Sequence, residues 1–402
     1  MSEKPRLLVL NQYYWPGLEA TAYLLSQLLG ALSDDFDVTV VTGRLAVHAP
    51  HAERVVHDGV KVVRVRSSAF DRSGMLGRGM NYATYLLQAL RVGLLSRRPD
   101  VVLCMTDPPV IGDVALLVAR RFRRPLVVVS QDVFPEIAVE LKRLENRRLI
   151  GILRVLIGWY LRHADRVIAI GEMMRKRLEQ KGASPERIVV IPNWVDTDTI
   201  RPQPRDNAWA RSRDLVDRFV VMHSGNVGHP QNLDVLIRAT TFLRDLDDLR
   251  VVIIGGGARR VELMELAERL ETDAVRFLDY QPRETLSSSL SSAHVHYVGL
   301  GRGLSGYVVP SRLYGILAAG RPVVAAADEE SETAAVVRTV GCGLVVPPNR
   351  PELVAGALRD LYDGGEDIEA MGRRGRAYVV AEADRSVAIE RYRRLLHELA
   401  TE

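Results

Sequence analysis

The sequence predicts an α/β protein made of two doubly wound parallel sheets. Short, fully apolar runs rich in valine and isoleucine alternate with amphipathic stretches in both halves of the chain. This alternation is typical of buried parallel strands covered by helices. Between the two series, residues 192–213 are rich in Pro, Asp, Asn, Trp and Arg and have no apolar period, which indicates a linker. We therefore expect an N-terminal domain over residues 1–200 and a C-terminal domain over 214–384, facing each other across a ligand-binding cleft.

The predicted strands follow the apolar runs in order. Those of the first half are Leu7–Leu10, Val38–Val41, Val60–Val65, Val101–Met105, Leu126–Val129, Val167–Ile170 and Ile188–Ile191. Those of the second half are Phe219–Met222, Val251–Ile254, Val275–Leu278, Val295–Val298, Val323–Ala326 and Gly343–Val346. Helical periodicity lies between several of them, as in Thr21–Leu32 and Ile111–Arg121. The final stretch, 385–402, also has a helical pattern and is compatible with packing back on the first domain.

The composition favours a soluble globular protein over a membrane-spanning or nucleic-acid-binding one. With 402 residues, 47% hydrophobic and 26% charged, the chain has the composition of a soluble globular protein. Neither a signal-peptide pattern nor an apolar run long enough to span a membrane is present, so we expect a cytoplasmic protein. Cys104 and Cys342 match no metal-binding spacing and are expected to be buried thiols in a reducing compartment. Aromatic residues are only 6% and do not alternate with basic ones, which disfavours nucleic-acid binding.

The stretch from Gly299 to Ala325 predicts half of a binding site for an anion. A glycine-rich loop leads into Pro310-Ser311-Arg312 and a short apolar helix, Leu313–Ala319. Gly320 occupies the position of a left-handed helix cap, and Pro322 prevents the helix from continuing. Backbone N–H groups at the start of such a helix favour a phosphate group.

Three further glycine-bearing turns directly follow predicted strands. They contain Gly17, the pair Gly225 and Gly228, and the run Gly255–Gly257. Glycine allows the close backbone approach that a diphosphate needs, although ordinary turn chemistry also explains any one of them. Neither Walker spacing nor a Gly-x-Gly-x-x-Gly pattern occurs, which disfavours a nucleoside triphosphatase or a dehydrogenase.

Polar residues follow the strand Leu126–Val129. Asp132 and Glu136 could orient a sugar hydroxyl or accept a proton at the carboxyl end of the sheet. An equally simple alternative is a helix N-terminus, with Asp132 as its cap and Glu136 favoured by the helix dipole. The residues alone leave both interpretations open.

Residues 146–162 predict a two-sided helix. One side carries Arg147, Gly151, Arg154, Gly158 and Arg162, and the other carries Leu149, Ile152, Leu153, Leu156 and Tyr160. Such a helix could rest on an anionic membrane surface, and the basic excess of residues 1–200 fits a membrane or a diphosphate as partner. The alternative is a domain helix with solvated arginines.

A set of motifs resembles a known enzyme family along nearly the whole chain. The motifs are Tyr13-Tyr14-Trp15-Pro16, Gln131-Asp132-x-x-Pro135-Glu136, Ala164-Asp165-Arg166-Val167-Ile168-Ala169, Ile191-Pro192-Asn193-Trp194-Val195-Asp196, Ser224-Gly225-Asn226-x-Gly228, Pro310-Ser311-Arg312-Leu313-Tyr314 and Ala318-Ala319-Gly320-Arg321-Pro322. Together they resemble the retaining GT-B glycosyltransferases of family 4, in particular the bacterial branch that builds cell-surface polysaccharides. The resemblance implies two Rossmann-like domains, with a nucleotide-sugar donor on the C-terminal domain and an acceptor on the N-terminal domain.

The chain departs from the wider family at its phosphate- and ribose-binding positions. Asn226 stands where most members have an arginine, and Gln231 stands near the position of the usual lysine. Of the paired glutamates near the ribose, one position is Gly315 and the other lies near Tyr307. The usual histidine of the N-terminal domain is replaced by Gln131. Because a diphosphate needs positive partners, Arg312 is the best substitute, with Arg302 and Arg321 as further candidates.

The resemblance implies transfer of a hexosyl or N-acetylhexosaminyl group, with retention, from a nucleoside-diphosphate sugar to a lipid-linked or saccharide acceptor. No metal or other cofactor is expected. The expected catalytic residues are Gln131, Asp132, Glu136 and Arg312. The expected donor-binding residues are Gly17, Gly225, Asn226, Gly228, Gly256, Tyr280, Ser311, Arg312 and Leu313.

Two alternatives from other classes remain at this stage. Non-hydrolysing nucleotide-sugar 2-epimerases share the two-domain architecture, and a non-catalytic binding protein could be built on the same fold. The non-catalytic alternative is suggested by the absence of the arginine, lysine and glutamate that the family usually carries.

Overall fold

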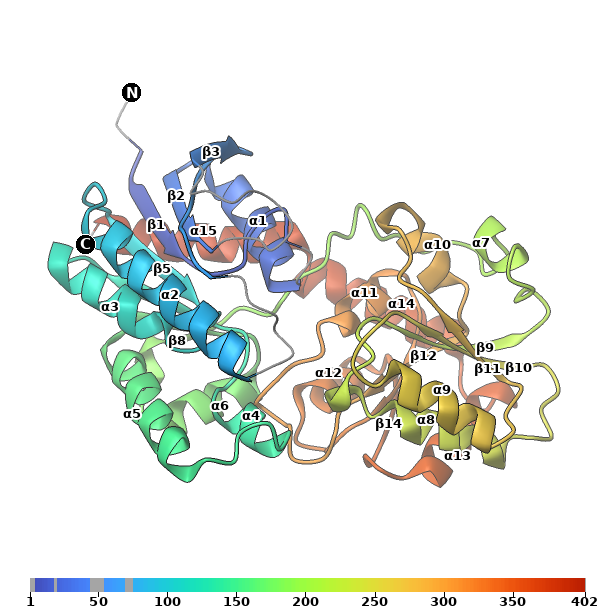
Figure 1. The fold of residues 1–402 in the computed structure, drawn as a ribbon. Helices are drawn as coiled ribbons and strands as arrows, with labels where there is room; N and C mark the ends of the chain where they lie inside the picture. The colour runs from blue at the N-terminus through green and yellow to red at the C-terminus, as the bar shows by residue number, and fades with distance from the viewer. Residues whose placement is uncertain (1–3, 18–19, 44–53, 69–74, 402) are drawn as a thin grey trace. The chain divides into compact units, whose positions relative to one another are not determined.

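The computed structural model describes residues 4–17, 20–43, 54–68 and 75–401. The chain divides into two compact units, residues 1–192 together with 389–402 and residues 193–388 (Figure 1). Each unit is an α/β domain with its own sheet and core. Every predicted apolar run overlaps a strand, so the predicted fold class is confirmed.

The first unit is built on an eight-stranded sheet of order β3-β4-β2-β1-β5-β6-β7-β8. All neighbouring pairs are parallel except β3 with β4. Its strands are β1 (Arg6–Leu10), β2 (Asp37–Thr42), β3 (Arg54–His57), β4 (Val60–Arg64), β5 (Val101–Met105), β6 (Leu126–Ser130), β7 (Arg166–Ala169) and β8 (Ile188–Val190). Every residue of β5 and β6 is buried, as expected for central strands covered on both faces.

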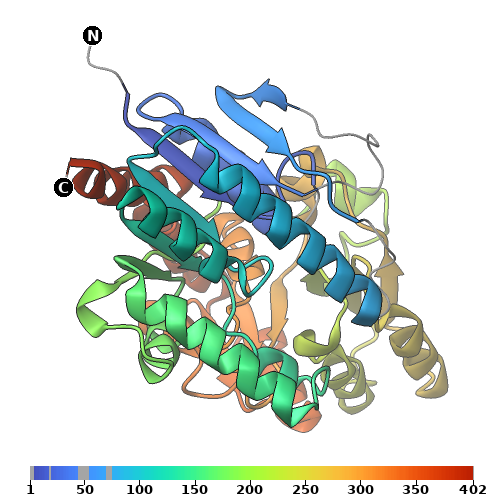
Figure 2. The ribbon, with the colours of Figure 1, turned by 60° about the vertical axis from the view of Figure 1, so that its left-hand side comes forward.

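Helices cover both faces of this sheet. They are α1 (Ala20–Leu32), α2 (Met75–Leu94), α3 (Ile111–Phe122), α4 (Glu136–Glu140), α5 (Arg147–His163), α6 (Glu172–Gln180), the 3₁₀ turn η1 (Pro185–Arg187) and α15 (Arg385–Thr401). In Figures 1 and 2, α2, α3 and α5 lie side by side over one face, while α15 lies over the other. No helix in the described ranges is long and apolar enough to cross a membrane.

The second unit contains a six-stranded, wholly parallel sheet of order β11-β10-β9-β12-β13-β14. The strands are β9 (Phe219–Ser224), β10 (Leu249–Ile254), β11 (Val275–Leu278), β12 (Val295–Gly299), β13 (Val323–Ala326) and β14 (Gly343–Val346). The α-helices are α7 (Ala208–Arg211), α8 (Leu233–Ala239), α9 (Arg260–Arg269), α10 (Leu286–Ser291), α11 (Arg312–Ala318), α12 (Glu332–Val340), α13 (Pro351–Tyr362) and α14 (Ile368–Glu382). The 3₁₀ turns are η2 (His229–Gln231), η3 (Thr240–Phe242) and η4 (Arg283–Thr285).

The stretch 192–213 is not a free linker. Trp209 and Ala210 are buried in a core cluster with Met222 of β9, and the Trp209 indole donates a hydrogen bond to Gln281 at 2.9 Å. The Arg201 backbone N–H donates to Ser287 Oγ at 3.1 Å. These contacts attach most of the predicted linker to the second unit, which begins at Asn193 rather than at residue 214.

The C-terminal helix α15 belongs to the first unit from Ile389 onward. The His397 ring lies 4.6 Å from the ring of Phe36, and the Arg393 guanidinium contacts Asp35 at 2.6 Å. Both cysteines are buried free thiols, and burial raises the pKa of both, that of Cys342 to about 11, so neither is a reactive thiolate near neutral pH.

The strand orders fix where each unit can bind a ligand. In the first unit the order reverses between β1 and β5, and in the second it reverses between β9 and β12. Loops that leave the carboxyl ends of neighbouring strands at such a switch point diverge and leave a crevice for ligands. The loops after β1, β5, β9 and β12 are therefore the ones that position the candidate site.

Helix α14 packs closely against the end of α11. Gly372 of α14 lies so near that a Cβ added to it would stand 2.1 Å from the carbonyl oxygen of Gly320. Gly320 itself has a φ of +69°, the left-handed cap conformation that the sequence predicted. Gly356 in α13, by contrast, has nothing within 4 Å of an added Cβ.

We expect Gly372→Ala and Gly356→Ala to change stability in opposite directions. Replacing a glycine inside a helix by alanine stabilises the helix by about 1 kcal/mol, because alanine has the higher helix propensity. Gly356→Ala should therefore raise the free energy of unfolding, whereas Gly372→Ala should lower it by about 1–3 kcal/mol, because the new methyl group forces α14 away from Gly320. Urea unfolding of the two variants checks this, and equal effects would contradict the described packing.

Candidate active site

The candidate site of the second unit begins at the end of β9. His223 is fully buried there, and Arg312 Nη1 donates a hydrogen bond to His223 Nδ1 at 3.0 Å. Because a guanidinium has only donors, Nδ1 must accept, and the ring proton of the neutral imidazole then sits on Nε2. His223 Nε2 lies 3.3 Å from the backbone oxygen of Asn226, to which it donates. Burial and the nearby Arg312 hold the pKa of His223 well below its usual value.

Arg312 carries an uncompensated charge. Within the described chain His223 is the hydrogen-bond partner of its guanidinium, and no carboxylate pairs with it. Burial lowers the pKa of Arg312 to about 10, so it stays protonated at neutral pH. A half-buried cation with a neutral neighbour retains its attraction for an anionic ligand.

Two glycine turns pack backbone against backbone beside Arg312. The Gly225 N–H donates to Ile254 O at 3.0 Å, and Val227 N–H donates to Gly256 O at 2.9 Å. A Cβ on Gly255 would stand 2.0 Å from Gly225 O, so only glycine fits this contact. The close approach of both turns leaves a smooth backbone surface at the carboxyl ends of β9 and β10.

Tyr280 adds an aromatic face to these turns. Its hydroxyl donates to Gly256 O at 3.2 Å, its ring lies 3.3 Å from the position of a Cβ on Gly255, and the residue is 62% exposed. The predicted donor residues Gly225, Gly256 and Tyr280 therefore lie together. Asn226 is exposed on the same turn, while Gly228 is buried and its N–H donates to Gln231 Oε1 at 3.0 Å.

The glycine-rich loop after β12 is fixed against the β9 side of the switch point. A Cβ on Gly299 would stand 2.2 Å from Gln231 O, and the Gly301 N–H donates to Pro230 O at 3.0 Å. The loop leads to exposed Ser311, to Arg312 as the first residue of α11, and to buried Leu313.

Arg321 does not belong to this cluster, contrary to its place among the candidate phosphate ligands. It follows the C-terminal end of α11, whereas Arg312 begins this seven-residue helix, about 10 Å away along the axis. Its guanidinium donates to Gln203 O at 3.0 Å and faces Glu369 at 3.4 Å.

In the first unit, buried polar groups gather at the switch point. Gln12 N–H donates to Asp107 O at 2.9 Å, which joins the loops after β1 and β5. The side-chain oxygens Asn11 Oδ1 and Gln12 Oε1 are buried and have no hydrogen-bond partner among the described residues. Gly17 closes the turn after β1, its N–H donating to Tyr14 O at 2.9 Å. Buried acceptors without donors are well suited to receive ligand hydroxyls.

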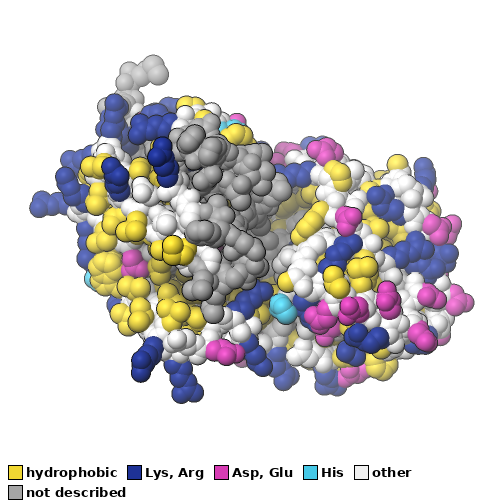
Figure 3. Space-filling model, in the orientation of Figure 1, with side chains coloured by type: hydrophobic (Ala, Val, Ile, Leu, Met, Phe, Trp, Pro, Cys, Tyr) yellow, Lys and Arg dark blue, Asp and Glu magenta, His cyan; other side chains and the backbone are white. Residues whose placement is uncertain are grey.

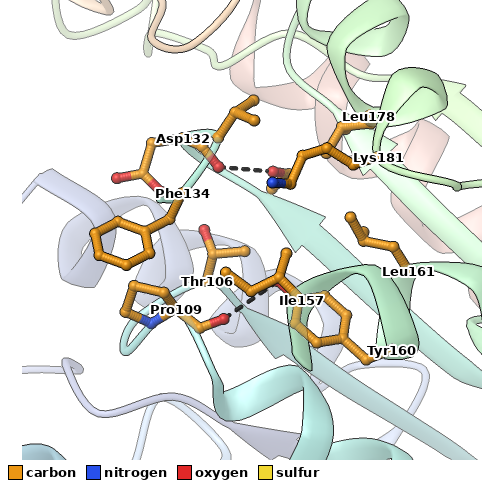
Figure 4. Close-up of a pocket in the computed structure, with 11 residues that line it drawn as sticks. Thr106, Pro109, Asp132, Phe134, Ile157, Tyr160, Leu161, Leu178 and Lys181 are labelled. Atoms are coloured by element: carbon orange, nitrogen blue, oxygen red, sulfur yellow. Dashed lines mark hydrogen bonds between the residues drawn. The ribbon is translucent and has the colours of Figure 1, made fainter. Parts of the chain in front are cut away.

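Asp132 lies in the next loop, after β6. Figure 4 shows it with Thr106, Pro109, Tyr160 and Lys181 around a small pocket of about 10 Å³, room for about one water molecule. Burial, together with the negative charge of Asp107, raises the pKa of Asp132 to about 7. Neighbouring Gln131 is half-buried, and its N–H donates to Thr106 Oγ1 at 3.2 Å.

Glu136 is engaged in an ion-pair network. Its carboxylate contacts Lys181 at 2.7 Å and Arg154 at 3.0 Å, which ties α4 to α5 and to the residue after α6. Despite the opposing effect of burial, these cations lower the pKa of Glu136. Its contacts favour a structural role over hydroxyl binding. Asp132 is not a helix cap, because Pro135 precedes α4 and no side chain caps its first turn.

Sequence reasoning missed Asn11, Gln12, Thr106 and His223 as site residues. Each is a buried polar residue at or just after the end of an apolar strand, and that position was the available signal. In the described part of the chain, no cluster of three or more His, Cys, Asp or Glu side chains could hold a metal ion.

We expect Asp132→Asn to stabilise the protein in a pH-dependent way. The folded pKa of Asp132, about 7, lies above its unfolded value of about 3.9, so ionisation costs stability as pH rises between these values. Asn removes this cost. The melting temperature of the variant relative to the parent should therefore climb by about 2 °C or more between about pH 4.5 and about pH 8.

Differential scanning calorimetry at several pH values checks this expectation. Asp113, whose pKa burial also raises to about 7, titrates in both proteins and cancels in the difference. A melting-temperature difference that does not vary with pH would contradict the shifted pKa of Asp132.

Comparison with known proteins agrees with this arrangement. Residues 17–194 match the family model of a glycosyl transferase 4-like domain, and residues 206–378 match that of glycosyl transferases group 1. The chain is 24% identical over 401 residues to the probable glycosyltransferase WbjE of Pseudomonas aeruginosa, covering 99% of each chain. It is 28% identical over 212 residues to the putative colanic acid biosynthesis glycosyl transferase WcaI of Escherichia coli, covering 50% of each.

A solved structure shares the fold over nearly the full length. The crystal structure of Anabaena HepE in complex with UDP superposes with a TM-score of 0.76 at 15% identity, covering 98% of this chain and 100% of HepE. The two family models follow one another along the chain, each on one of the two Rossmann-like units. The chain therefore belongs to the GT-B glycosyltransferases of family 4.

Proposed function

We propose that the protein transfers a hexosyl or N-acetylhexosaminyl group, with retention of configuration, from a nucleoside-diphosphate sugar to a lipid-linked or saccharide acceptor in cell-surface polysaccharide synthesis. The observation that carries this proposal is the Arg312 guanidinium, which has no carboxylate partner among the described residues and is held by neutral His223 beside the Gly225 and Gly255 turns. HepE has been crystallised with UDP and with UDP-glucose, which supports a nucleotide sugar as donor. The name of WcaI, a putative enzyme of colanic acid synthesis, supports a polysaccharide product.

The donor diphosphate binds where backbone and Arg312 converge. Gly225 and its neighbours allow phosphate oxygens to approach the main chain, and the Arg312 N–H groups that His223 does not occupy donate to them. Tyr280 offers an exposed ring for stacking on the nucleobase. Asn226 on the turn after β9, Ser311 just before α11 and Leu313 within α11 border this site.

The sugar–phosphate bond breaks as negative charge develops on the departing diphosphate. Arg312 stabilises this charge from a half-buried position, where it is worth more than in water. The acceptor oxygen bonds to the anomeric carbon on the face that the phosphate leaves, and the acceptor proton passes to the departing phosphate oxygen. This route requires neither a metal nor a dedicated base.

The first unit positions the acceptor. Asn11 Oδ1, Gln12 Oε1 and Asp132 Oδ1 are buried oxygens that accept hydrogen bonds from sugar hydroxyls. Gln131 lies next to Asp132 and contributes to the same polar surface, and the Gly17 turn borders it. Glu136 supports this loop through Lys181 and Arg154 rather than by touching the acceptor.

We expect Arg312→Ala to lower turnover by roughly 10²–10³-fold, the usual cost of removing one group that stabilises a developing oxyanion. Donor affinity should fall as well, because the diphosphate loses its cation. Arg312→Lys should recover part of the turnover and part of the donor affinity. Lysine restores the positive charge but lacks the planar set of N–H donors of a guanidinium. Turnover with a donor found by a thermal-shift screen of nucleoside-diphosphate sugars checks this.

Arg338→Ala is the matched control, because Arg338 is a solvent-exposed arginine of the same unit, paired with Glu329 at 2.9 Å. Unchanged turnover and donor affinity in Arg312→Ala would contradict the role of Arg312. The parent protein with donor alone separates transfer from its alternatives. An epimerase would convert the donor without acceptor, and a binding protein would leave it intact with every acceptor.

We further propose that α5 contacts an anionic membrane that carries the acceptor. Four apolar residues of α5 are exposed, namely Leu149, Ile152, Val155 and Leu156. The helix contains no acidic residue, and Arg147 and Arg148 are exposed at its start. Figure 3 shows apolar and basic side chains together on the face of the first unit where α2, α3 and α5 lie. The side of α5 that packs on the domain consists of other residues, namely Ile150, Ile157, Gly158, Tyr160 and Leu161.

We expect the double variants Ile152→Ser/Val155→Ser and Arg147→Gln/Arg148→Gln to bind less to vesicles of phosphatidylcholine and phosphatidylglycerol. Each arginine near an anionic surface contributes about 1 kcal/mol, so the arginine pair should cost roughly tenfold or more in partitioning. Val261→Ser/Met264→Ser, which removes exposed apolar residues from the second unit, is the control. Co-sedimentation that is unaltered by both α5 variants would remove the membrane contact from the proposal.

A further inference from the structure

A second hollow in the C-terminal unit lies at the opposite end of α11 from Arg312. It has a volume of about 320 Å³, within the range of about 300–1,000 Å³ that small-molecule sites occupy. It is lined by Pro202, Gln203, Ala319, Gly320, Arg321, Glu369, Arg373, Arg376 and Ala377. None of these residues takes part in the donor site described above.

Positive charge dominates the lining of this hollow. Arg321, Arg373 and Arg376 face a single carboxylate, that of Glu369. Arg321 is only 6% exposed, and its Nε is buried with no hydrogen-bond partner in the described chain. Its contact with Glu369 is long, at 3.4 Å, and the Glu369 side chain is 67% exposed, so the pair is not a tight ion pair.

The other arginines are held by groups that do not neutralise them. Arg376 donates to the backbone oxygens of Ala318 and Ile200, both at 2.9 Å. Arg373 is exposed, and its nearest carboxylate, that of Asp367, is 4.0 Å away. Backbone carbonyls orient a guanidinium without cancelling its charge, so the hollow keeps an excess of positive charge.

Burial accounts for most of the pKa shifts of the groups around the hollow, and the charges of the arginines add to it. Burial first and the charges of Arg205 and Arg321 second lower the pKa of His294 to about 3. Burial lowers the pKa of Arg205 and Arg321, the charge of Glu369 opposes this shift in both, and the charge of Arg205 lowers the pKa of Arg321 further. Cations that are partly desolvated and close to one another gain from an anion placed between them.

We infer that this hollow is a second anion site, which binds the phosphate monoester group of a small metabolite. Guanidinium groups recognise the oxygens of a phosphate through paired N–H donors. The volume leaves room for an attached sugar beyond the phosphate. The inference does not depend on the transfer reaction, because it uses no residue of the donor site.

Titration calorimetry of the full chain tests the site, with inorganic phosphate and a hexose 6-phosphate as probes at constant ionic strength set by sodium chloride. We expect both probes to bind and the hexose phosphate to bind more tightly. Arg373→Gln should weaken binding roughly tenfold, because a hydrogen bond to a charged group is lost. Glu369→Gln should strengthen binding, because it removes the one carboxylate of the lining.

Arg374→Gln is the matched control. Arg374 does not line the hollow, and its Nε donates to Gly341 O at 2.7 Å. Arg312→Ala separates this site from the donor site: it removes the cation that also attracts phosphate there, and the hexose phosphate should still bind to this variant through the hollow. Absent heats in the parent protein would overturn the inference. Equal losses in Arg373→Gln and Arg374→Gln, or loss of binding in Arg312→Ala, would do the same.

Discussion

The hydrogen bond from Arg312 to His223 determines what the donor half of the site can bind. It places a guanidinium at the carboxyl end of β9, where the strand order of the second unit reverses. A carboxylate partner would have cancelled the charge, whereas a neutral imidazole orients the guanidinium and leaves its charge available. The imidazole stays neutral because burial and the cation both oppose its protonation. In the proposed donor site, Arg312 takes the role that the family resemblance assigns to an arginine and a lysine at the positions of Asn226 and Gln231.

The same contact explains why so many glycines surround it. A cation alone attracts an anion but does not shape a site for a diphosphate, which also needs backbone at close range. The Gly225 and Gly255 turns meet with no space for a Cβ, and the Gly299 turn is fixed against Gln231 in the same way. These turns are rigid because they pack on each other, so their N–H groups and Arg312 hold fixed relative positions before a ligand arrives.

Sequence patterns predicted the fold well because buried parallel strands are apolar throughout, and each such run overlaps a strand. The exception is β3, whose four residues Arg54–His57 contain only two apolar ones and lie at the sheet edge. The stretch 192–213 was wrongly predicted as a linker, because Trp209 and Ala210 anchor it without any apolar period. In α5 apolar residues occur on both the buried and the exposed side, so the two-sided pattern did not show that Ile150 and Ile157 would be buried while Ile152, on the predicted apolar side, would be exposed.

The site was only partly predictable, because the partner of a charged residue comes from elsewhere in the chain. Sequence motifs predicted Arg312 but not His223, since a histidine that ends an apolar strand is usually a core residue. The motifs also assigned the same candidate role, hydroxyl binding or proton transfer, to Asp132 and Glu136. Glu136 forms an ion pair with Lys181, forty-five positions away, and its pKa is lowered. Asp132 is buried with Asp107 nearby, and its pKa is raised. Two carboxylates four positions apart therefore differ in chemistry because of residues that no local pattern contains.

Three arginines of the second unit show how partners decide function. Arg259 follows a glycine turn and would suit a phosphate by position, but Asp234 and Glu262 bind it at 2.8 and 2.6 Å and neutralise it. Arg312 donates a hydrogen bond to the neutral imidazole of His223. Arg321 donates to the backbone oxygen of Gln203 and lies 3.4 Å from the Glu369 carboxylate. Desolvating a cation without a close counter-ion costs stability, so a fold keeps such cations where a ligand supplies the missing charge. By this criterion Arg259 is structural, whereas the cations at the two ends of α11 are those for which we propose anionic ligands.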